Sequence, residues 1–367
     1  MNSSKATDYV VPEEFRGDAW LTFSSWINSI SAYLYLTDFI ISFIGIFPSL
    51  FHFWVLTRES MRHLTTNLFL IGMTLCGIIH MICNIIEFCP LLYNYYFSFE
   101  ISFECFPFAS YSKIVSNYYS SMTNAVVTGM LTYFTVAMAI IRFLVVKFPF
   151  ARSMQRLIYS KSGLKILLPI IILILPLWIA EISSTNIVET GIWVPGPNCD
   201  IFAENYTEKM YTVETSITFG IDDFYWIVYY IYAVIFQFIP SILLPISTVL
   251  LIIELKKNKK TKTWTSKSQD RSTKLVVYMT ISFIMANAPY SLIYSLSFML
   301  SAYARMIISQ LSVIAYLLTT LNVATHWLLC YFMSTQYRNT AREILGKNNI
   351  DSTVMVISYQ TSRAKMF

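Results

Sequence analysis

The sequence predicts an all-α membrane protein, a seven-transmembrane helix bundle with a short amphipathic membrane-surface helix after the seventh span. Hydrophobic residues make up 56% of the 367 residues and charged residues only 13%, whereas roughly a quarter of an ordinary soluble domain is charged. The apolar residues also gather into runs of about 20, the length that a helix needs to cross the hydrocarbon core. Seven such runs occur, near residues 32–57, 64–89, 117–147, 163–183, 224–255, 274–301 and 307–333.

These runs divide the chain into an N-terminal tail (1–31), a transmembrane domain (32–333) and a C-terminal region (334–367). Residues 334–345 at the start of the last region can form an amphipathic helix, which predicts that it lies along the membrane surface. Its apolar side holds Tyr337, Ala341, Ile344 and Leu345, and its basic side holds Arg338 and Arg342.

The distribution of basic residues predicts the orientation, because Lys and Arg are retained in cytoplasmic loops. With the N-terminus outside, 20 of the 26 Lys and Arg residues fall in inner segments and five in outer ones. We therefore expect a multi-pass plasma-membrane protein with an extracellular N-terminus. Two Asn-X-Ser/Thr triplets, at Asn2 and Asn205, then lie outside as candidate glycosylation sites. Such triplets are common by chance, so they agree with this orientation without establishing it.

Three of the six cysteines lie at or beyond the outer ends of the spans, where the compartment is oxidising. Cys199, in the long loop at 184–223, can tether that loop to the bundle by pairing with Cys105, our preferred candidate, or with Cys89. Three free thiols are the remaining alternative, because sequence does not determine connectivity.

At the inner end of the third span the chain reads Ile-Arg-Phe-Leu-Val-Val-Lys-Phe-Pro-Phe, residues 141–150. Arginine near a membrane core costs about 2.5 to 3.5 kcal/mol on insertion scales, so Arg142 invites a functional interpretation. The alternative is an arginine that snorkels to the interface. The segment resembles the Asp-Arg-Tyr segment of rhodopsin-like receptors, including the later Pro149 and Phe150.

A more specific resemblance is to the class W nematode serpentine receptors, a rhodopsin-like branch related to FMRFamide-type peptide receptors. It covers most of residues 35–345 and is carried by residues 51–62, 239–255, 270–274 and 332–338. The resemblance implies a G-protein-coupled receptor, with arrestin and membrane lipid as further partners. It assigns G-protein coupling to Arg142, Lys147, Pro149 and Phe150, and an activation switch in the sixth span to Asn287 and Pro289.

The chain departs from the wider superfamily at four positions. Gly77 replaces a buried Asp of the second span, and Ile141 replaces the acidic neighbour of Arg142. Asn287 replaces the tryptophan of the sixth span, and the seventh-span Asn-Pro motif begins here with His326. We therefore expect an internal switch that is built differently.

Alignment to the family places a set of polar side chains on the inward face of the outer half, with Glu87 and Asp38 near the rim. The candidate ligand-binding residues are Glu87, Asn124, Thr128, Asn287, Tyr290, Tyr294, Tyr316 and Thr320. Glu87 can bind a ligand guanidinium through both oxygens, or be an interfacial carboxylate in water. The tyrosines can instead belong to the aromatic belt at the membrane interface.

Acidic residues gather on the outer side, where eight lie between residues 181 and 223 with Lys209 as the one basic residue. Such a field attracts cations, which favours a basic, RFamide-like neuropeptide as ligand. Alternatives are a loop that is acidic only for solubility, a small-molecule chemosensory ligand, or a transporter or channel. The four histidines are isolated in sequence, so we expect no metal, no cofactor and no enzyme, and nothing indicates nucleic-acid binding.

Overall fold

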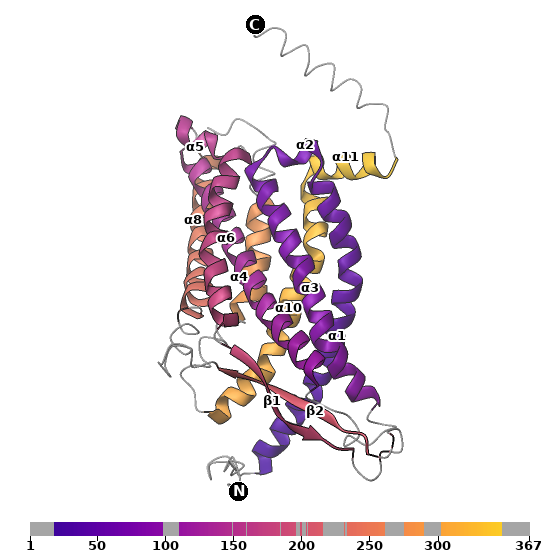
Figure 1. The fold of residues 1–367 in the computed structure, drawn as a ribbon. Coiled ribbons are helices and arrows are strands. Elements are labelled where there is room, and N and C mark those ends of the chain that lie inside the picture. The colour runs from indigo at the N-terminus through magenta and orange to yellow at the C-terminus, as the bar shows by residue number, and fades with distance from the viewer. Residues whose placement is uncertain are drawn as a thin grey trace.

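The computed structural model describes residues 18–97, 110–148, 150–158, 160–183, 185–195, 199, 203, 205–215, 231, 233–260, 275–289 and 302–346. Its long helices run side by side as a bundle (Figure 1). A β-hairpin lies at one end, the hairpin end, and the short helices α2, α5 and α11 lie at the other, the α11 end. The long helices are α1 (Asp18–Leu56), α3 (Thr65–Phe97), α4 (Tyr111–Lys147), α6 (Ser160–Ser183), α8 (Ile239–Lys260), Leu275–Pro289 and α10 (Ala302–Met333).

The described helices agree with the predicted spans. Six of them are long and apolar enough to cross a membrane, and the described helix Leu275–Pro289 is a shorter apolar one. Each overlaps one of the seven apolar runs, which confirms the predicted all-α bundle. Helix α1 begins at Asp18 and so extends into the segment expected to be a tail, while a π-helix, η3 (Ala233–Phe238), leads into α8.

Close packing of α1, α3 and α10 depends on small residues, as is common in membrane helix interfaces. A Cβ atom at Gly45 of α1 would lie 2.9 Å from Cβ of Ala324 on α10. At Gly77 of α3 a Cβ atom would overlap Cγ1 of Val323. The Asp of the wider superfamily therefore does not fit at Gly77, because α10 occupies its space.

Apolar side chains fill the middle of the bundle and also cover its outside. Phe69 and Phe134 join α3 to α4 with ring centroids 6.2 Å apart. Large apolar residues on the outer faces stay exposed, among them Phe47, Ile172 and Met285. An exposed apolar surface of this extent is expected where the surrounding solvent is lipid.

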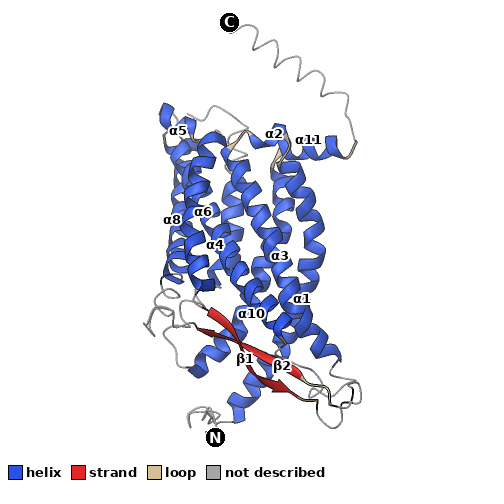
Figure 2. Cartoon of the chain, viewed as in Figure 1, coloured by secondary structure: helices blue, strands red, loops and turns tan. Residues whose placement is uncertain are grey.

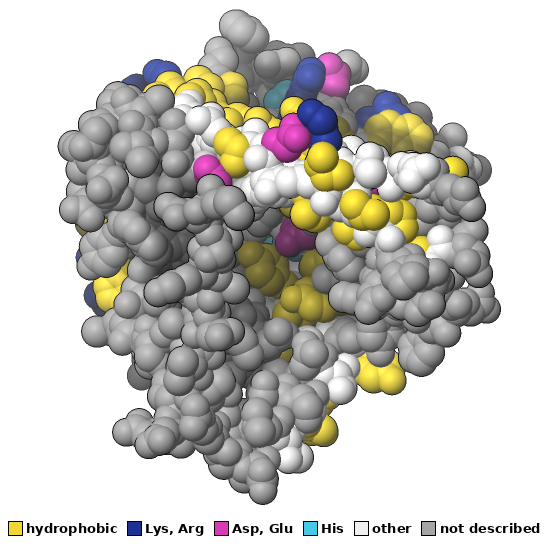
Figure 3. Space-filling view, turned by 60° about the horizontal axis from the view of Figure 1, so that its bottom comes forward, with side chains coloured by type: hydrophobic (Ala, Val, Ile, Leu, Met, Phe, Trp, Pro, Cys, Tyr) yellow, Lys and Arg dark blue, Asp and Glu magenta, His cyan; other side chains and the backbone are white. Residues whose placement is uncertain are grey.

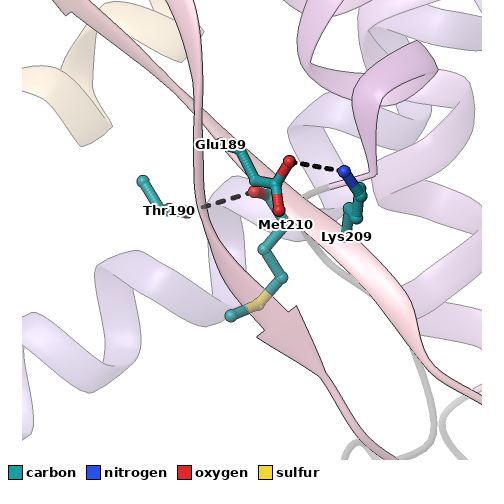
Figure 4. Close-up of polar contacts among 4 residues, drawn as sticks. All are labelled: Glu189, Thr190, Lys209 and Met210. Atoms are coloured by element: carbon teal, nitrogen blue, oxygen red, sulfur yellow. Dashed lines mark hydrogen bonds and ion pairs between the residues drawn. The ribbon is translucent and has the colours of Figure 1, made fainter.

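The long loop between the fourth and fifth spans contains an antiparallel hairpin, β1 (Thr185–Trp193) and β2 (Glu208–Thr215), which Figure 2 shows in red. The sequence analysis did not predict these strands, although Thr, Val, Ile, Tyr and Trp residues favour them. A bulge between Glu189 and Gly191 leaves Thr190 outside the pairing register. The Thr190 hydroxyl donates to the carbonyl oxygen of Met210 at 3.4 Å (Figure 4).

The predicted membrane-surface helix is present as α11 (Thr335–Ile344), which follows α10 after one residue. Ser334 caps its first turn by accepting a hydrogen bond from the backbone N–H of Tyr337 at 3.2 Å, an arrangement typical of helix N-termini. The short helices α2 (Glu59–Arg62) and α5 (Arg152–Arg156) lie at the same end. In α11, Tyr337 and Ala341 are buried and Arg342 is exposed, as the amphipathic pattern predicts.

Candidate functional site

A buried group of polar side chains joins three helices in the half of the bundle toward the hairpin end. It consists of Asp38 and Ser42 from α1, Asn84 from α3 and Thr320 from α10, all 0% exposed. The Asn84 amide nitrogen lies 3.5 Å from Oδ2 of Asp38, 3.4 Å from Oγ of Ser42 and 3.0 Å from Oγ1 of Thr320. We call these four residues the Asp38 cluster.

His80 and Asn124 extend this cluster to a fourth helix, α4. The Asn124 amide donates to Oδ1 of Asn84 at 2.8 Å, and the Nδ1–H of His80 donates to Oδ1 of Asn124. Nε2 of His80 accepts from the Thr320 hydroxyl at 3.0 Å. Because every link is buried, this polar chain couples the positions of α1, α3, α4 and α10.

Two acidic side chains lie close together on the hairpin-end side of this chain. Glu87 of α3 is half-buried and interacts electrostatically with Asp38. The ion pairs found among the described residues join Arg62 to Glu59 and Lys209 to Glu189, so neither Glu87 nor Asp38 has a cationic partner there. Figure 3 shows the hairpin end hollowed, with acidic and hydrophobic side chains inside the hollow.

The structure brings some of the candidate ligand residues together and separates others. Asn124 and Thr320 meet in the polar chain, and the Thr128 hydroxyl is buried with no hydrogen-bond partner among the residues described. Asn287 is buried further along, where its amide donates to the Phe283 carbonyl at 3.2 Å and accepts from Thr319 at 3.5 Å.

The candidate tyrosines and Asp38 are placed as follows. Tyr316 is half-buried, and Tyr290 and Tyr294 lie outside the described residues. Asp38, expected at the rim, is instead fully buried. The sequence analysis missed His80 and Asn84, whose spacing of four residues places both on one face of α3 and could have indicated a shared site.

At the α11 end Arg142 is inside the protein. It is only 6% exposed and its Nη2 donates to the hydroxyl of Thr66, near the start of α3. An arginine that snorkels to the interface would be exposed, so this burial favours the functional interpretation. Ile141, in place of the usual acid, is itself buried in the core.

The remaining coupling candidates lie at the surface of the same end. The Lys147 ammonium lies over the rings of Phe143 and Phe148, 5.2 and 5.4 Å from their centroids. Phe150 is 93% exposed, which leaves a large apolar side chain available to a partner. Pro149 lies outside the described residues, and Pro289 is the last described residue of its helix.

A second buried polar group ties α11 to the bundle. Nδ1 of His52 on α1 lies 2.9 Å from the Tyr337 hydroxyl. Burial raises the pKa of Tyr337, so the phenol stays neutral and donates to His52. His326, at the altered seventh-span motif, is only 3% exposed and interacts electrostatically with His52. The hydrogen bond between His52 and Tyr337 therefore joins α1 to α11.

The hairpin carries charge and a candidate glycosylation site. Lys209 Nζ lies 2.8 Å from Oε2 of Glu189 (Figure 4), and this hydrogen bond and the charge of Glu189 raise the pKa of Lys209. Asn205 is exposed in the turn between the strands, with φ of 72°. Asn2 lies outside the described residues, as do Asp200, Glu204, Asp222 and Asp223 of the acidic loop.

Cys199 is disulfide-bonded, as expected for a loop tether. Cys89, the alternative partner in the sequence analysis, is a free thiol. The preferred partner Cys105 lies outside the described residues, so the pairing of Cys105 with Cys199 stays a prediction.

Within the described part of the chain, no group of three or more His, Cys, Asp or Glu side chains is arranged to hold a metal ion.

The sequence model of one family, the serpentine type 7TM GPCR chemoreceptor Srw, matches residues 36–348. No curated protein matches the chain. The match agrees with the class W resemblance and with the bundle of apolar helices. Because it covers most of the 367 residues, the chain belongs to the serpentine seven-transmembrane G-protein-coupled chemoreceptor family Srw.

Proposed function

We propose that this G-protein-coupled receptor lies in the plasma membrane with its hairpin end outside, and that a basic, RFamide-like neuropeptide activates it. The observation that carries the proposal is the half-buried Glu87, which has no cationic partner among the described residues. An ionisable group within a membrane span is costly and normally has a partner. A ligand guanidinium can supply this partner by forming two parallel hydrogen bonds with the carboxylate.

The hollow and the hairpin support the same ligand chemistry. Acidic atoms lie inside the hollow (Figure 3), so its interior carries negative charge. On the hairpin, Lys209 neutralises Glu189, but Glu208 and Glu214 form no ion pair in the described part of the structure. A cationic peptide is therefore attracted to this end before it contacts Glu87.

The α11 end supports G-protein docking. It carries the basic residues Lys147, Arg152 and Arg342 and the exposed Phe150 around the buried Arg142. In the proposed mechanism, ligand binding favours a second packing of the helices in which the Leu275–Pro289 helix moves outward and Arg142 becomes accessible. A ligand shifts such an equilibrium only by the difference in its affinity for the two packings.

The test expresses the chain with a promiscuous G protein and measures signalling in response to amidated peptides that contain Arg near the C-terminus. Each peptide is paired with a copy in which citrulline replaces Arg, which removes the charge and keeps the shape. We expect the Arg peptides to signal and the citrulline copies to lose at least about tenfold in potency, the equivalent of one charge-assisted hydrogen bond.

Receptor variants locate the contact. Glu87→Gln should reduce the potency of the Arg peptide to that of the citrulline peptide, because both changes remove the same ion pair. Glu189→Gln is the matched control, since Lys209 already neutralises that carboxylate, and its potency should stay within about threefold. Signalling that is equal for the Arg and citrulline peptides would contradict the proposal.

A small-molecule ligand is the second candidate, because the family is described as chemoreceptors. The same assay separates the two candidates when it includes volatile and water-soluble small molecules. If small molecules activate the receptor while all amidated peptides remain silent, the chemosensory function replaces the peptide function.

A further inference from the structure

Asp38 is a carboxylate whose charge nothing described in the structure balances. It is 0% exposed, and its Oδ1 has no hydrogen-bond partner among the described residues. The described ion pairs involve other residues, and Glu87, which interacts electrostatically with Asp38, adds negative charge. Buried charges in proteins are normally paired or bind a cation.

The atoms around Asp38 are the kind that bind a small cation. The amide nitrogen of Asn84 is surrounded by Oδ2 of Asp38 at 3.5 Å, Oγ of Ser42 at 3.4 Å and Oγ1 of Thr320 at 3.0 Å. Nε2 of His80 lies 3.4 Å from the same nitrogen. Nε2 of His80 already accepts from the Thr320 hydroxyl. An NH2 group has two hydrogens, so it cannot donate to Asp38, Ser42 and Thr320 together.

We propose that the Asp38 cluster binds one small monovalent cation, coordinated by the Asp38 carboxylate, the Ser42 and Thr320 hydroxyls and the side-chain carbonyl of Asn84. The ion lies between α1, α3 and α10 and holds these three helices together. This site is separate from the proposed contact of a ligand with Glu87, and it does not depend on the identity of that ligand.

The polar chain can turn the Asn84 carbonyl toward Asp38 while it keeps the hydrogen bonds that link Asn84, Asn124 and His80. If the Asn84 and Asn124 amides both reverse, Nδ2 of Asn84 donates to Oδ1 of Asn124, and Nδ2 of Asn124 donates to Nδ1 of His80. The His80 proton then sits on Nε2 and faces Thr320, whose hydroxyl donates to the Tyr316 carbonyl, 3.2 Å away. The reversal gives up the donations from the Asn84 amide to Asp38, Ser42 and Thr320. In the proposed site the attraction of the cation to the four oxygens offsets this loss.

The chemistry of the cluster selects the ion. Carboxylate, hydroxyl and amide oxygens prefer hard cations, and a divalent ion would normally require more carboxylates than Asp38 supplies. In the described part of the chain no three His, Cys, Asp or Glu side chains are arranged for a transition metal. A single buried negative charge with neutral oxygens around it matches one positive charge.

The test measures the thermal unfolding of the full chain in detergent at constant ionic strength in NaCl, KCl or N-methylglucamine chloride. The buried thiols of Cys76, Cys83 and Cys330 report unfolding through a thiol-reactive fluorophore. A ligand of the folded state raises the unfolding midpoint in a saturable way. We expect Na⁺ to raise the midpoint by about 2–4 °C relative to N-methylglucamine, with K⁺ weaker because it is larger.

Variants distinguish this site from a general salt effect. Asp38→Asn should abolish the difference between salts. If that variant does not fold, Ser42→Ala and Thr320→Val test the site instead, and each should raise the half-saturating Na⁺ concentration several-fold. Glu343→Gln removes an exposed carboxylate at the other end and should keep the full response. Equal midpoints of the wild-type chain in the three salts, or a Na⁺ response that persists in Asp38→Asn or in both hydroxyl variants, would overturn the proposal.

Discussion

Thr66 provides Arg142 with a hydrogen-bond acceptor at the α11 end, where the neighbour of the arginine is an isoleucine. Its hydroxyl accepts from Nη2 of Arg142, and both residues are buried. A hydrogen bond to a charged group contributes about 1.5 to 3 kcal/mol. Thr66 therefore favours the packing in which Arg142 is turned inward.

We predict that Thr66→Val, which keeps the shape and removes the hydroxyl, raises ligand-free G-protein signalling. Each 1.4 kcal/mol lost from the resting packing shifts the equilibrium about tenfold, so an increase of several-fold is expected. Basal signalling per receptor at the cell surface is the measurement, and Thr66→Ser, which retains the hydroxyl, should stay at the wild-type level. Unchanged basal signalling in Thr66→Val would assign the restraint of Arg142 to other contacts.

At the scale of elements, α11 is held to the bundle by three buried side chains, Tyr337, Thr340 and Ala341. Tyr337 is 1% exposed, and its ring lies 5.2 Å from that of His52. The half-buried Arg338 donates hydrogen bonds to the carbonyl oxygens of Tyr331 and Phe332 near the end of α10, which water can replace. Tyr337 is the largest of the buried side chains that position α11.

Substitutions at Tyr337 should separate packing from hydrogen bonding. Tyr337→Phe leaves Nδ1 of His52 without its donor and should destabilise the fold by about 1 to 3 kcal/mol, while Tyr337→Ala also leaves a cavity and should cost about 3 to 5 kcal/mol. Thermal unfolding in detergent measures both. Tyr331→Phe on the exposed face of α10 is the control, and equal midpoints for all three variants would contradict this role.

Over the whole molecule the two ends differ in charge and in structure, and this difference predicts the orientation. The hairpin, with Asn205 exposed in its turn, lies at the end opposite α11. With the hairpin end outside, a receptor carrying Asn2→Gln should still be glycosylated at Asn205 and shift on a gel after glycosidase treatment.

Asn205→Gln in the same background should remove this shift. A tag placed after Gly346 should bind antibody only in permeabilised cells, because α11 then lies on the cytoplasmic side. Antibody binding to intact cells would instead place the α11 end outside and reverse the orientation.

Features that depend on local sequence were predictable. Span length and apolar content locate the helices because backbone groups in lipid must be satisfied within each helix, and the spacing of Tyr337, Ala341 and Arg342 predicts α11. The sequence left open whether Arg142 snorkels to the interface, and its burial depends on the packing of the helices around it.

The remaining features depend on contacts between residues that are far apart in the chain. Nothing near Gly77 in the sequence indicates that Val323 fills the space beside it, and the hydroxyl that receives Arg142 comes from a different helix. The β-hairpin was missed because the pairing of Thr185 with Thr215 is set by tertiary contacts across the loop.

By itself the sequence determined the class of protein, the number of spans, the surface helix and the end that carries Arg142, because these follow from hydrophobicity, charge and local periodicity. Only the tertiary structure decided that Asp38 is buried rather than at the rim, and that it meets Ser42, Asn84 and Thr320. Helix periodicity says which residues share a face but not how the helices are rotated against one another. That rotation depends on packing at residues such as Gly45 and Gly77, and it placed the polar cluster inside the bundle.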